Sequence, residues 1–262
     1  MFSLSGPEDR VPADHPLREV KRLADEALKQ LSPVFDGMYS ARGRHSIPPE
    51  RLLKATLLIA LHSVRSERLF CEQLDYNLLF RWFLDMGLEE KSFDHSTFSF
   101  NRERLLKHDV AKQFLGAVVS QAKELGLVSK EHFSADGTLI EAWASLKSFR
   151  PKGEEKKDED PPDDPGNPTV DFHGEKRSNA THESTTDPEA KLARKSNGQT
   201  AKLSYSLNGL MENRNGLVVG LMLEQASGVA ERESALDMLY AVGGSQRITL
   251  GADKGYDTKD FV

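Results

Sequence analysis

The order of residue patterns after Glu131 constrains this chain more than any other feature. The stretch "FSADGTLIEAWAS", at 133–145, is rich in residues that favour extended structure and predicts a strand. Two apolar runs on either side of Asn215-Gly216, a strong turn signal, predict an antiparallel hairpin. "ERESALDMLYAV" predicts a helix, and "RITLGAD" predicts a buried strand that runs into Asp253.

Strand, hairpin, helix and strand in this order match the start of a ribonuclease H-like fold. The first and fourth strands of that fold are neighbours, so Asp136 and Asp253 can meet although they are far apart in the sequence. Each follows small residues and has a glycine close behind it, which lets a ligand approach the backbone. One alternative stays open: Asp136-Gly137 can also be the two-residue turn of a hairpin.

Residues 1–130 are predicted to form an all-helical module. Pro48-Pro49 is a helix start signal, and Ser66, Asn77 and Asp94 each stand where they can cap a following helix. "DVAKQFLGAVVSQAKELG" predicts a helix that ends at Gly126, with an apolar face formed by Val110, Phe114, Val118, Ala122 and Leu125. The expected class is therefore α+β, with a helical module at 1–130 and an α/β domain at 131–262.

Charge is spread unevenly along the chain. The net charge is −6, but residues 151–190 alone carry five Lys or Arg and twelve Asp or Glu, which leaves +1 for the rest. The Pro, Gly and charge content of about 151–180 predicts a mobile acidic insertion. A single cysteine, Cys71, excludes an intramolecular disulfide and a thiolate zinc cluster. Neither a membrane-spanning run nor a signal peptide is visible, so the expected location is the cytoplasm, without a membrane partner.

Asp136 and Asp253 are the candidate catalytic and metal-binding residues. Mg²⁺ prefers oxygen ligands and is usually held by one or two carboxylates, and Mn²⁺ can substitute for it. Two such ions about 3.5–4 Å apart can activate an attacking water or 3′-hydroxyl and stabilise the leaving oxygen in phosphodiester cleavage or strand transfer. The pair therefore predicts metal-dependent chemistry on a nucleic acid.

DNA is the expected partner. In the helical module, basic side chains suited to phosphate contacts are Arg42, Arg44, Arg51, Lys54, Arg65 and Arg68. "HSTFSFNRERL" offers groups suited to base edges in a major groove at Ser96, Ser99, Asn101, Arg102 and Arg104, with Phe98 and Leu105 facing the core. A second basic stretch, with Lys191, Arg194 and Lys195, can follow the DNA backbone. The alternative interpretation of these residues is a solvated surface.

Several long motifs resemble the DDE transposases of bacterial insertion sequences, in the group named after insertion sequence five. They are "FSADGTLIEAWASLKSFRPK", "GEKRSNATHESTTDPEAKLARKSNGQTAKLSYSLNGLMENRNGLVVG" and "ADKGYDT". Residues 40–110 resemble the InsH-type N-terminal domain of that group. The resemblance implies a ribonuclease H-like catalytic domain, Mg²⁺, terminal inverted repeats and target DNA as substrates, and a homodimer on DNA. By matching motifs, Asp136 is the first catalytic aspartate and Asp253 the second.

The third acid of the family, a glutamate, normally lies well downstream of "DKGYD", so we expect it beyond residue 262 and the chain to be C-terminally truncated. Glu231 and Glu233 are interpreted as capping residues of the predicted helix. Two departures from the family pattern stand at Leu207-Asn208 and at Gly220. The alternative functions are a non-catalytic DNA-binding remnant or inhibitor derived from a transposase, and a metal-dependent nuclease of the same fold.

Overall fold

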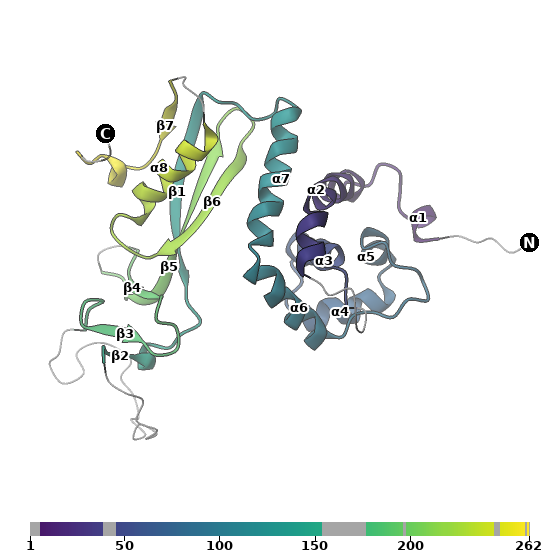
Figure 1. Cartoon of the computed structure of the whole chain (residues 1–262), viewed down its shortest axis with the longest axis horizontal. Helices are drawn as coiled ribbons and strands as arrows, with labels where there is room; N and C mark the ends of the chain where they lie inside the picture. Colours follow the sequence, from purple (N-terminus) through teal and green to yellow (C-terminus); the bar gives the residue numbers. More distant parts are fainter. Residues whose placement is uncertain are drawn as a thin grey trace, which may run out of the picture. The chain divides into compact units, whose positions relative to one another are not determined.

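A computed structural model describes residues 6–38, 46–153, 177–195, 198–243, 247–259 and 261. The chain divides into two compact units, Met1–Leu127 and Val128–Val262. In the described residues the first unit is helical, and the second contains the strands and one long helix (Figure 1). This is an α+β arrangement. The predicted acidic insertion falls mainly on residues 154–176, which lie outside the described residues.

The helices of the first unit are α1 (Pro7–Arg10), α2 (Leu17–Met38), α3 (Pro49–Leu61), α4 (Glu67–Tyr76), α5 (Leu78–Phe83), α6 (His95–Lys107) and α7 (Val110–Glu124). The three predicted caps are confirmed. Ser66 Oγ accepts from the N–H of Leu69, Asn77 Oδ1 from two N–H groups of α5, and Asp94 Oδ1 from two of α6. Each cap satisfies donors that the first helical turn leaves unpaired.

Aromatic rings form the centre of the first unit's core. Phe70 stacks on Phe80 with ring centroids 5.5 Å apart, and Phe98 lies 6.1 Å from Phe70. Phe98 and Leu105 are buried, which confirms the prediction that they face the core. Leu125 was expected on the buried face of α7 but is 62% exposed, because α7 ends at Glu124 and Leu125 belongs to the turn that follows.

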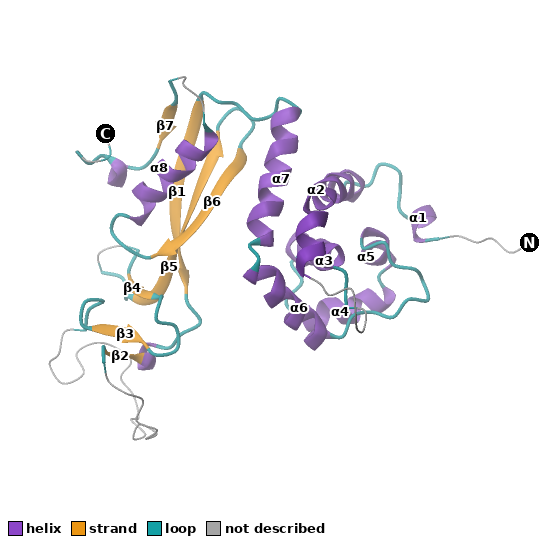
Figure 2. Ribbon diagram, in the orientation of Figure 1, coloured by secondary structure: helices purple, strands orange, loops and turns teal. Residues whose placement is uncertain are grey.

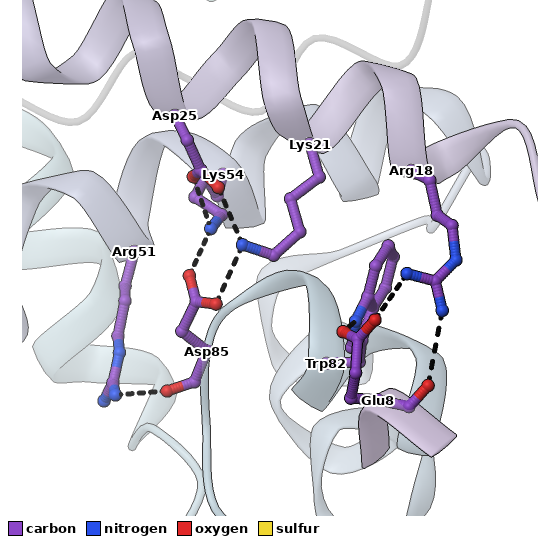
Figure 3. A network of polar contacts seen from close by, with 8 residues as sticks. All are labelled: Glu8, Arg18, Lys21, Asp25, Arg51, Lys54, Trp82 and Asp85. Atoms are coloured by element: carbon purple, nitrogen blue, oxygen red, sulfur yellow. Dashed lines mark hydrogen bonds and ion pairs between the residues drawn. The ribbon is translucent and has the colours of Figure 1, made fainter. Parts of the chain in front are cut away.

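A network of two lysines and two aspartates stabilises the same unit (Figure 3). Lys54 Nζ is 2.8 Å from Asp25 and also contacts Asp85, and Lys21 lies 2.7 and 2.8 Å from the same two carboxylates. Lys54 is only 2% exposed. The prediction that Lys54 contacts DNA phosphates is therefore wrong, since its ammonium group is buried and already paired.

In the second unit, five strands of the described residues form one mixed sheet (Figure 2). They are β1 (His132–Glu141), β4 (Lys191–Ala193), β5 (Lys202–Glu212), β6 (Leu217–Gln225) and β7 (Thr249–Gly251). β5 pairs with β1, β4 and β6, in each case antiparallel. β7 pairs with β1 in parallel. β1 continues through Asp136-Gly137, so the alternative in which this pair forms a hairpin turn is wrong.

The remaining elements are short, apart from helix α8 (Ala230–Val242) between β6 and β7. β2 (Phe149–Pro151) and β3 (His182–Ser184) form an antiparallel ribbon, preceded by the 3₁₀ turn η1 (Leu146–Ser148). A second 3₁₀ turn, η3 (Lys254–Tyr256), follows β7. The predicted hairpin, the helix after it and the strand before Asp253 are thus confirmed as elements.

Helix α8 packs on one face of the sheet. Phe133 and Ala135 of β1 and Leu210 of β5 form a core with Ala235 and Met238 of α8. Alternation along a strand then places Ser134 and Asp136 on the opposite face from Phe133 and Ala135. Gly220 of β6 permits this packing, because a Cβ there would lie 3.0 Å from the sulfur of Met238.

The buried side chain of Glu212 stabilises the turn between β5 and β6. It is fully buried, and its carboxylate accepts from the N–H groups of Ser129, Arg214 and Asn215 at 3.0, 3.3 and 2.6 Å. Burial acts to raise the pKa of Glu212, but these backbone donors outweigh it and hold the pKa below its ordinary value. The buried charge is therefore satisfied by the turn that it stabilises.

Candidate acidic site and nucleic-acid interface

Asp136 lies within β1, and Asp253 lies two residues beyond the end of β7, the strand that pairs in parallel with β1. Ser134 of β1 is paired with Gly251 of β7, and each aspartate stands two residues further on. Asp253 follows the end of β7 with extended backbone angles, φ −72° and ψ 172°. Because side chains alternate along an extended chain, both aspartates belong to the sheet face opposite α8.

A backbone N–H orients each carboxylate. Asp136 Oδ1 accepts from the N–H of Gly137 at 2.9 Å, and Asp253 Oδ1 accepts from the N–H of Gly255 at 2.7 Å. Both residues are exposed. Each retains a second oxygen for a ligand, so the pair offers hard, oriented oxygen donors at one end of the sheet.

Glu231, in the first turn of α8, lies against Gly137, the residue that follows Asp136. A Cβ built on Gly137 would stand 2.8 Å from Glu231 Oε1 and 2.7 Å from Asn208 Oδ1. Residue 137 must therefore be a glycine, because the Glu231 side chain occupies the space that a Cβ at this position would fill. Glu231 and Glu233 both lie in the first turn of α8, as the capping interpretation predicts. Ser227 Oγ also accepts from the N–H groups of Val229 and Ala230 at 3.3 and 3.0 Å.

The charges of both aspartates affect the pKa of Glu231. Burial raises the pKa of Glu231, and the negative charges of Asp253 and Asp136 raise it further. Tyr256 of η3 is 4% exposed, and burial together with the charges of the same three carboxylates raises its pKa to about 12. No sequence signal separates Glu231 from Glu233, because both stand in the first turn of one helix and only the packing of α8 distinguishes them.

The donor set fits a hard divalent cation. Among the described residues, no group of three or more His, Cys, Asp or Glu side chains is already arranged around a single metal position. Mg²⁺ does not require one, because it commonly keeps several waters and takes one or two carboxylates from the protein. Asp136 and Asp253 satisfy that requirement.

The helical unit has a groove of about 520 Å³ between the end of α3, the start of α4 and α6. Three guanidinium groups and an imidazole line it, those of Arg65, Arg68, Arg102 and His95. Glu67 lies among them and forms an ion pair with Arg102. A concave, cationic surface of this kind suits a phosphate backbone.

The residues predicted to contact base edges differ in exposure and in their hydrogen-bond partners. Asn101 is 3% exposed, donates to the carbonyl of Thr97 at 2.8 Å and accepts from Ser46 Oγ at 2.9 Å, so its amide is bonded within the unit and is not presented at the surface. Ser96 Oγ donates to Asp94, and Ser99 Oγ donates to Glu67. Arg102 lines the groove.

The guanidinium group of Arg104 lies 5.8 Å from the ring centre of Phe100, which is 64% exposed. An exposed aromatic ring beside an arginine is a surface on which a base can stack. Arg104 therefore stays in the predicted DNA-contacting set, and Phe100 joins it.

The basic residues predicted to contact phosphates also differ in their surroundings. Arg65 and Arg68 line the groove, whereas Arg51 forms an ion pair with Glu90 and donates to the carbonyl of Asp85 at 2.7 Å. Arg42 and Arg44 lie outside the described residues. In the second unit, Lys191 of β4 donates to the carbonyl of Pro188 at 3.1 Å, and the next basic residues, Arg194 and Lys195, are exposed.

The helical part is similar to a known family. Residues 6–104 match the family described as Transposase domain (DUF772), which supports a transposase that acts on DNA. Searches of curated proteins and of solved structures found no match. No helix in the described part of the chain is both long and apolar enough to cross a membrane.

Proposed function

We propose that this chain is a DDE-type transposase of the insertion sequence five group, with an InsH-type N-terminal DNA-binding domain. It cleaves and joins DNA strands at the ends of an insertion sequence and works as a homodimer on DNA. The observation that supports the proposal is the parallel pairing of β1 with β7, in which Ser134 is opposite Gly251 and Asp136 and Asp253 each follow two residues later. It occurs in a chain whose helical part matches a transposase domain.

The proposed catalytic domain is ribonuclease H-like. Its support is the strand order β6-β5-β1-β7, in which an antiparallel hairpin lies beside β1 and a helix leads to a parallel fourth strand. Ligand sites of open α/β sheets lie at the carboxyl ends of parallel strands, where Asp253 stands. Asp253 therefore lies where chemistry is expected, beside the neighbouring strand β1 that carries Asp136.

Asp136 and Asp253 would hold Mg²⁺, or Mn²⁺ in its place. When bound, the ions lower the pKa of an attacking water or 3′-hydroxyl and neutralise the leaving oxygen. The two aspartates fix the reacting phosphate relative to the sheet, with Gly137 and Gly255 orienting their carboxylates. In the helical unit, Arg65 and Arg68 neutralise phosphates and position the duplex, and Arg102 contacts base edges.

The test is strand cleavage of a duplex that carries the terminal inverted repeats flanking the gene, with Mg²⁺ or Mn²⁺. Asp136→Asn and Asp253→Asn should each lower the cleavage rate at least a hundredfold while leaving DNA affinity within about twofold. Asp237→Asn, an exposed position on α8, is the matched control because it removes the same charge from the same unit. Tight, specific DNA binding with no cleavage by the wild-type chain would instead support the non-catalytic remnant or inhibitor.

A further inference from the structure

We propose that a pocket at the start of strands β1 and β7 binds a backbone phosphate of the DNA strand on which Asp136 and Asp253 act. The inference rests on the proposed function, because it assigns a second DNA contact to the unit that carries the acidic pair. The strand-start pocket is lined by His132, Phe133, Asn213, Arg214, Thr249, Leu250 and Gly251. Its chemistry, its support and its position relative to the two aspartates all favour a phosphate ligand.

The strand-start pocket offers hydrogen-bond donors and positive charge. Its volume is about 600 Å³, and its polar groups are the guanidinium of Arg214, the amide of Asn213, the imidazole of His132 and the hydroxyl of Thr249. None of the described residues that line it is acidic. Arg247, two residues before Thr249, is exposed and adds a positive charge to the same segment. Guanidinium and amide N–H groups are common partners of DNA phosphates, so this lining suits a phosphodiester anion.

Hydrogen bonds hold the backbone around the pocket in place. The buried carboxylate of Glu212 accepts from the N–H of Arg214 at 3.3 Å, and the N–H of Asn213 donates to the carbonyl of His132 at 3.0 Å. His132 Nδ1 lies 2.6 Å from Thr249 Oγ1, which links β1 to β7. Because the backbone is already fixed, binding a phosphate requires little further ordering of the chain.

The pocket is aligned with the two aspartates along the same pair of strands. His132 and Thr249 are direct partners in the parallel pairing of β1 with β7, and Asp136 and Asp253 each follow four residues later. Side chains an even number of residues apart lie on the same face of a sheet, so all four share the face opposite α8. The distance along the strands is about 13 Å at 3.3 Å per residue. One strand of a DNA duplex covers that distance in about four nucleotides.

The two ends of this face differ in charge. The acidic end attracts a cation, whereas the strand-start pocket attracts an anion, so a DNA strand that crosses the face is held at two points and in one direction. Arg214 forms an ion pair with Glu131 at 3.2 Å, and both side chains are 61% exposed. Solvent screens such a pair, so a phosphate can replace Glu131 as the partner of Arg214. Arg214 is therefore a positioning residue for the DNA strand.

The experiment measures the affinity of the full chain for a duplex that carries the terminal inverted repeats, by fluorescence anisotropy at several salt concentrations. Arg214→Gln should lower the affinity at least about threefold and reduce its slope against salt by about one, because one phosphate contact is lost. Lys202→Gln is the matched control in the same unit, since Lys202 also forms an exposed ion pair, with Glu141 at 2.8 Å. It should leave the slope unchanged. Circular dichroism establishes that each variant is folded.

A second measurement locates the phosphate. One phosphate of the duplex at a time is replaced by an uncharged methylphosphonate. A replacement about four nucleotides from the end of the terminal repeat, where cleavage is proposed, should weaken binding by the wild-type chain and have no further effect on Arg214→Gln. A general loss of charge does not produce this result, because it would weaken both proteins alike.

The outcomes separate the two proposals. Equal effects of Arg214→Gln and Lys202→Gln overturn the strand-start pocket, and so do phosphate replacements that affect the wild-type chain and Arg214→Gln alike. If Asp136→Asn still abolishes cleavage in that case, the proposed function stands. Absence of both DNA binding and cleavage in the wild-type chain overturns both proposals.

Discussion

Glu231 Oε1 of α8 lies 2.8 Å from the point that a Cβ of Gly137 on β1 would occupy. The helix can place its carboxylate there only because residue 137 is glycine. This contact joins the first turn of α8 to the strand that carries Asp136. It also explains the Asp-Gly pair in the sequence without a turn.

The first prediction concerns that contact. Gly137→Ala should destabilise the chain by about 1–3 kcal/mol, because the new methyl group would overlap Glu231 and Asn208. The measurement is urea denaturation followed by circular dichroism. Gly209→Ala is the matched control in the neighbouring strand, since its Cβ would meet Leu221 at an ordinary 3.5 Å. Equal stability of the two variants would contradict the overlap.

The second prediction concerns the buried lysine. Lys54→Met should cost about 2–3 kcal/mol, because it leaves Asp25 and Asp85 with Lys21 as their remaining partner in the network. Arg22→Met, which removes two exposed ion pairs on α2, should cost much less than Lys54→Met, because solvent screens exposed ion pairs. Thermal unfolding of both variants gives the comparison, and similar losses in the two would show that burial does not distinguish them.

The third prediction concerns pH. The folded pKa of Glu212 lies below its ordinary value of 4.5, so its stabilising contribution is fully present above that value and is lost as the pH falls through the folded pKa. Glu212→Gln should lower stability at pH 7 by about 2 kcal/mol, since it removes a charged acceptor of several backbone N–H groups. The deficit should shrink as the pH drops below 4.5. Denaturation at a series of pH values measures it, and a deficit independent of pH would be inconsistent with an ionised Glu212.

The fourth prediction concerns DNA recognition. Arg102→Ala should reduce the difference in binding free energy between DNA with cognate ends and random DNA by about 1–3 kcal/mol, because it removes a base contact. Arg68→Ala should weaken binding to both DNAs alike and reduce the slope of affinity against salt by about one. Fluorescence anisotropy at several salt concentrations separates the two effects, with exposed Lys112→Ala as the control. An unchanged cognate-to-random ratio would remove Arg102 from base reading.

The fifth prediction follows from the ion pair between Glu67 and Arg102. Among the described residues that line the groove, Glu67 is the one acid. Glu67→Gln removes its charge and releases Arg102, so affinity for any DNA should rise several-fold at low salt. Glu103→Gln, at an exposed position on α6, removes the same charge outside the groove lining and should change affinity less. Equal effects of the two substitutions would show that only net charge matters.

Local pattern and cap chemistry were enough to predict the elements around the site. Ser66, Asn77 and Asp94 cap helices as expected, because capping involves residues only two or three positions apart. The β5–β6 hairpin follows from its turn residues for the same reason. The α+β class likewise follows from the order of these elements.

Side-chain roles that depend on contacts distant in sequence needed the tertiary structure. Lys54 and Asn101 have the residue types of DNA ligands, yet the packing of the helices buries both and pairs them internally. The sequence does not distinguish Glu231 from Glu233, since both stand in the first turn of α8. The packing of α8 on the sheet places Glu231 against Gly137. The sequence by itself thus determined the elements and singled out Asp136 and Asp253 as candidates. Only the tertiary structure decided which charged groups are buried and paired within the protein, because that depends on which surfaces pack together.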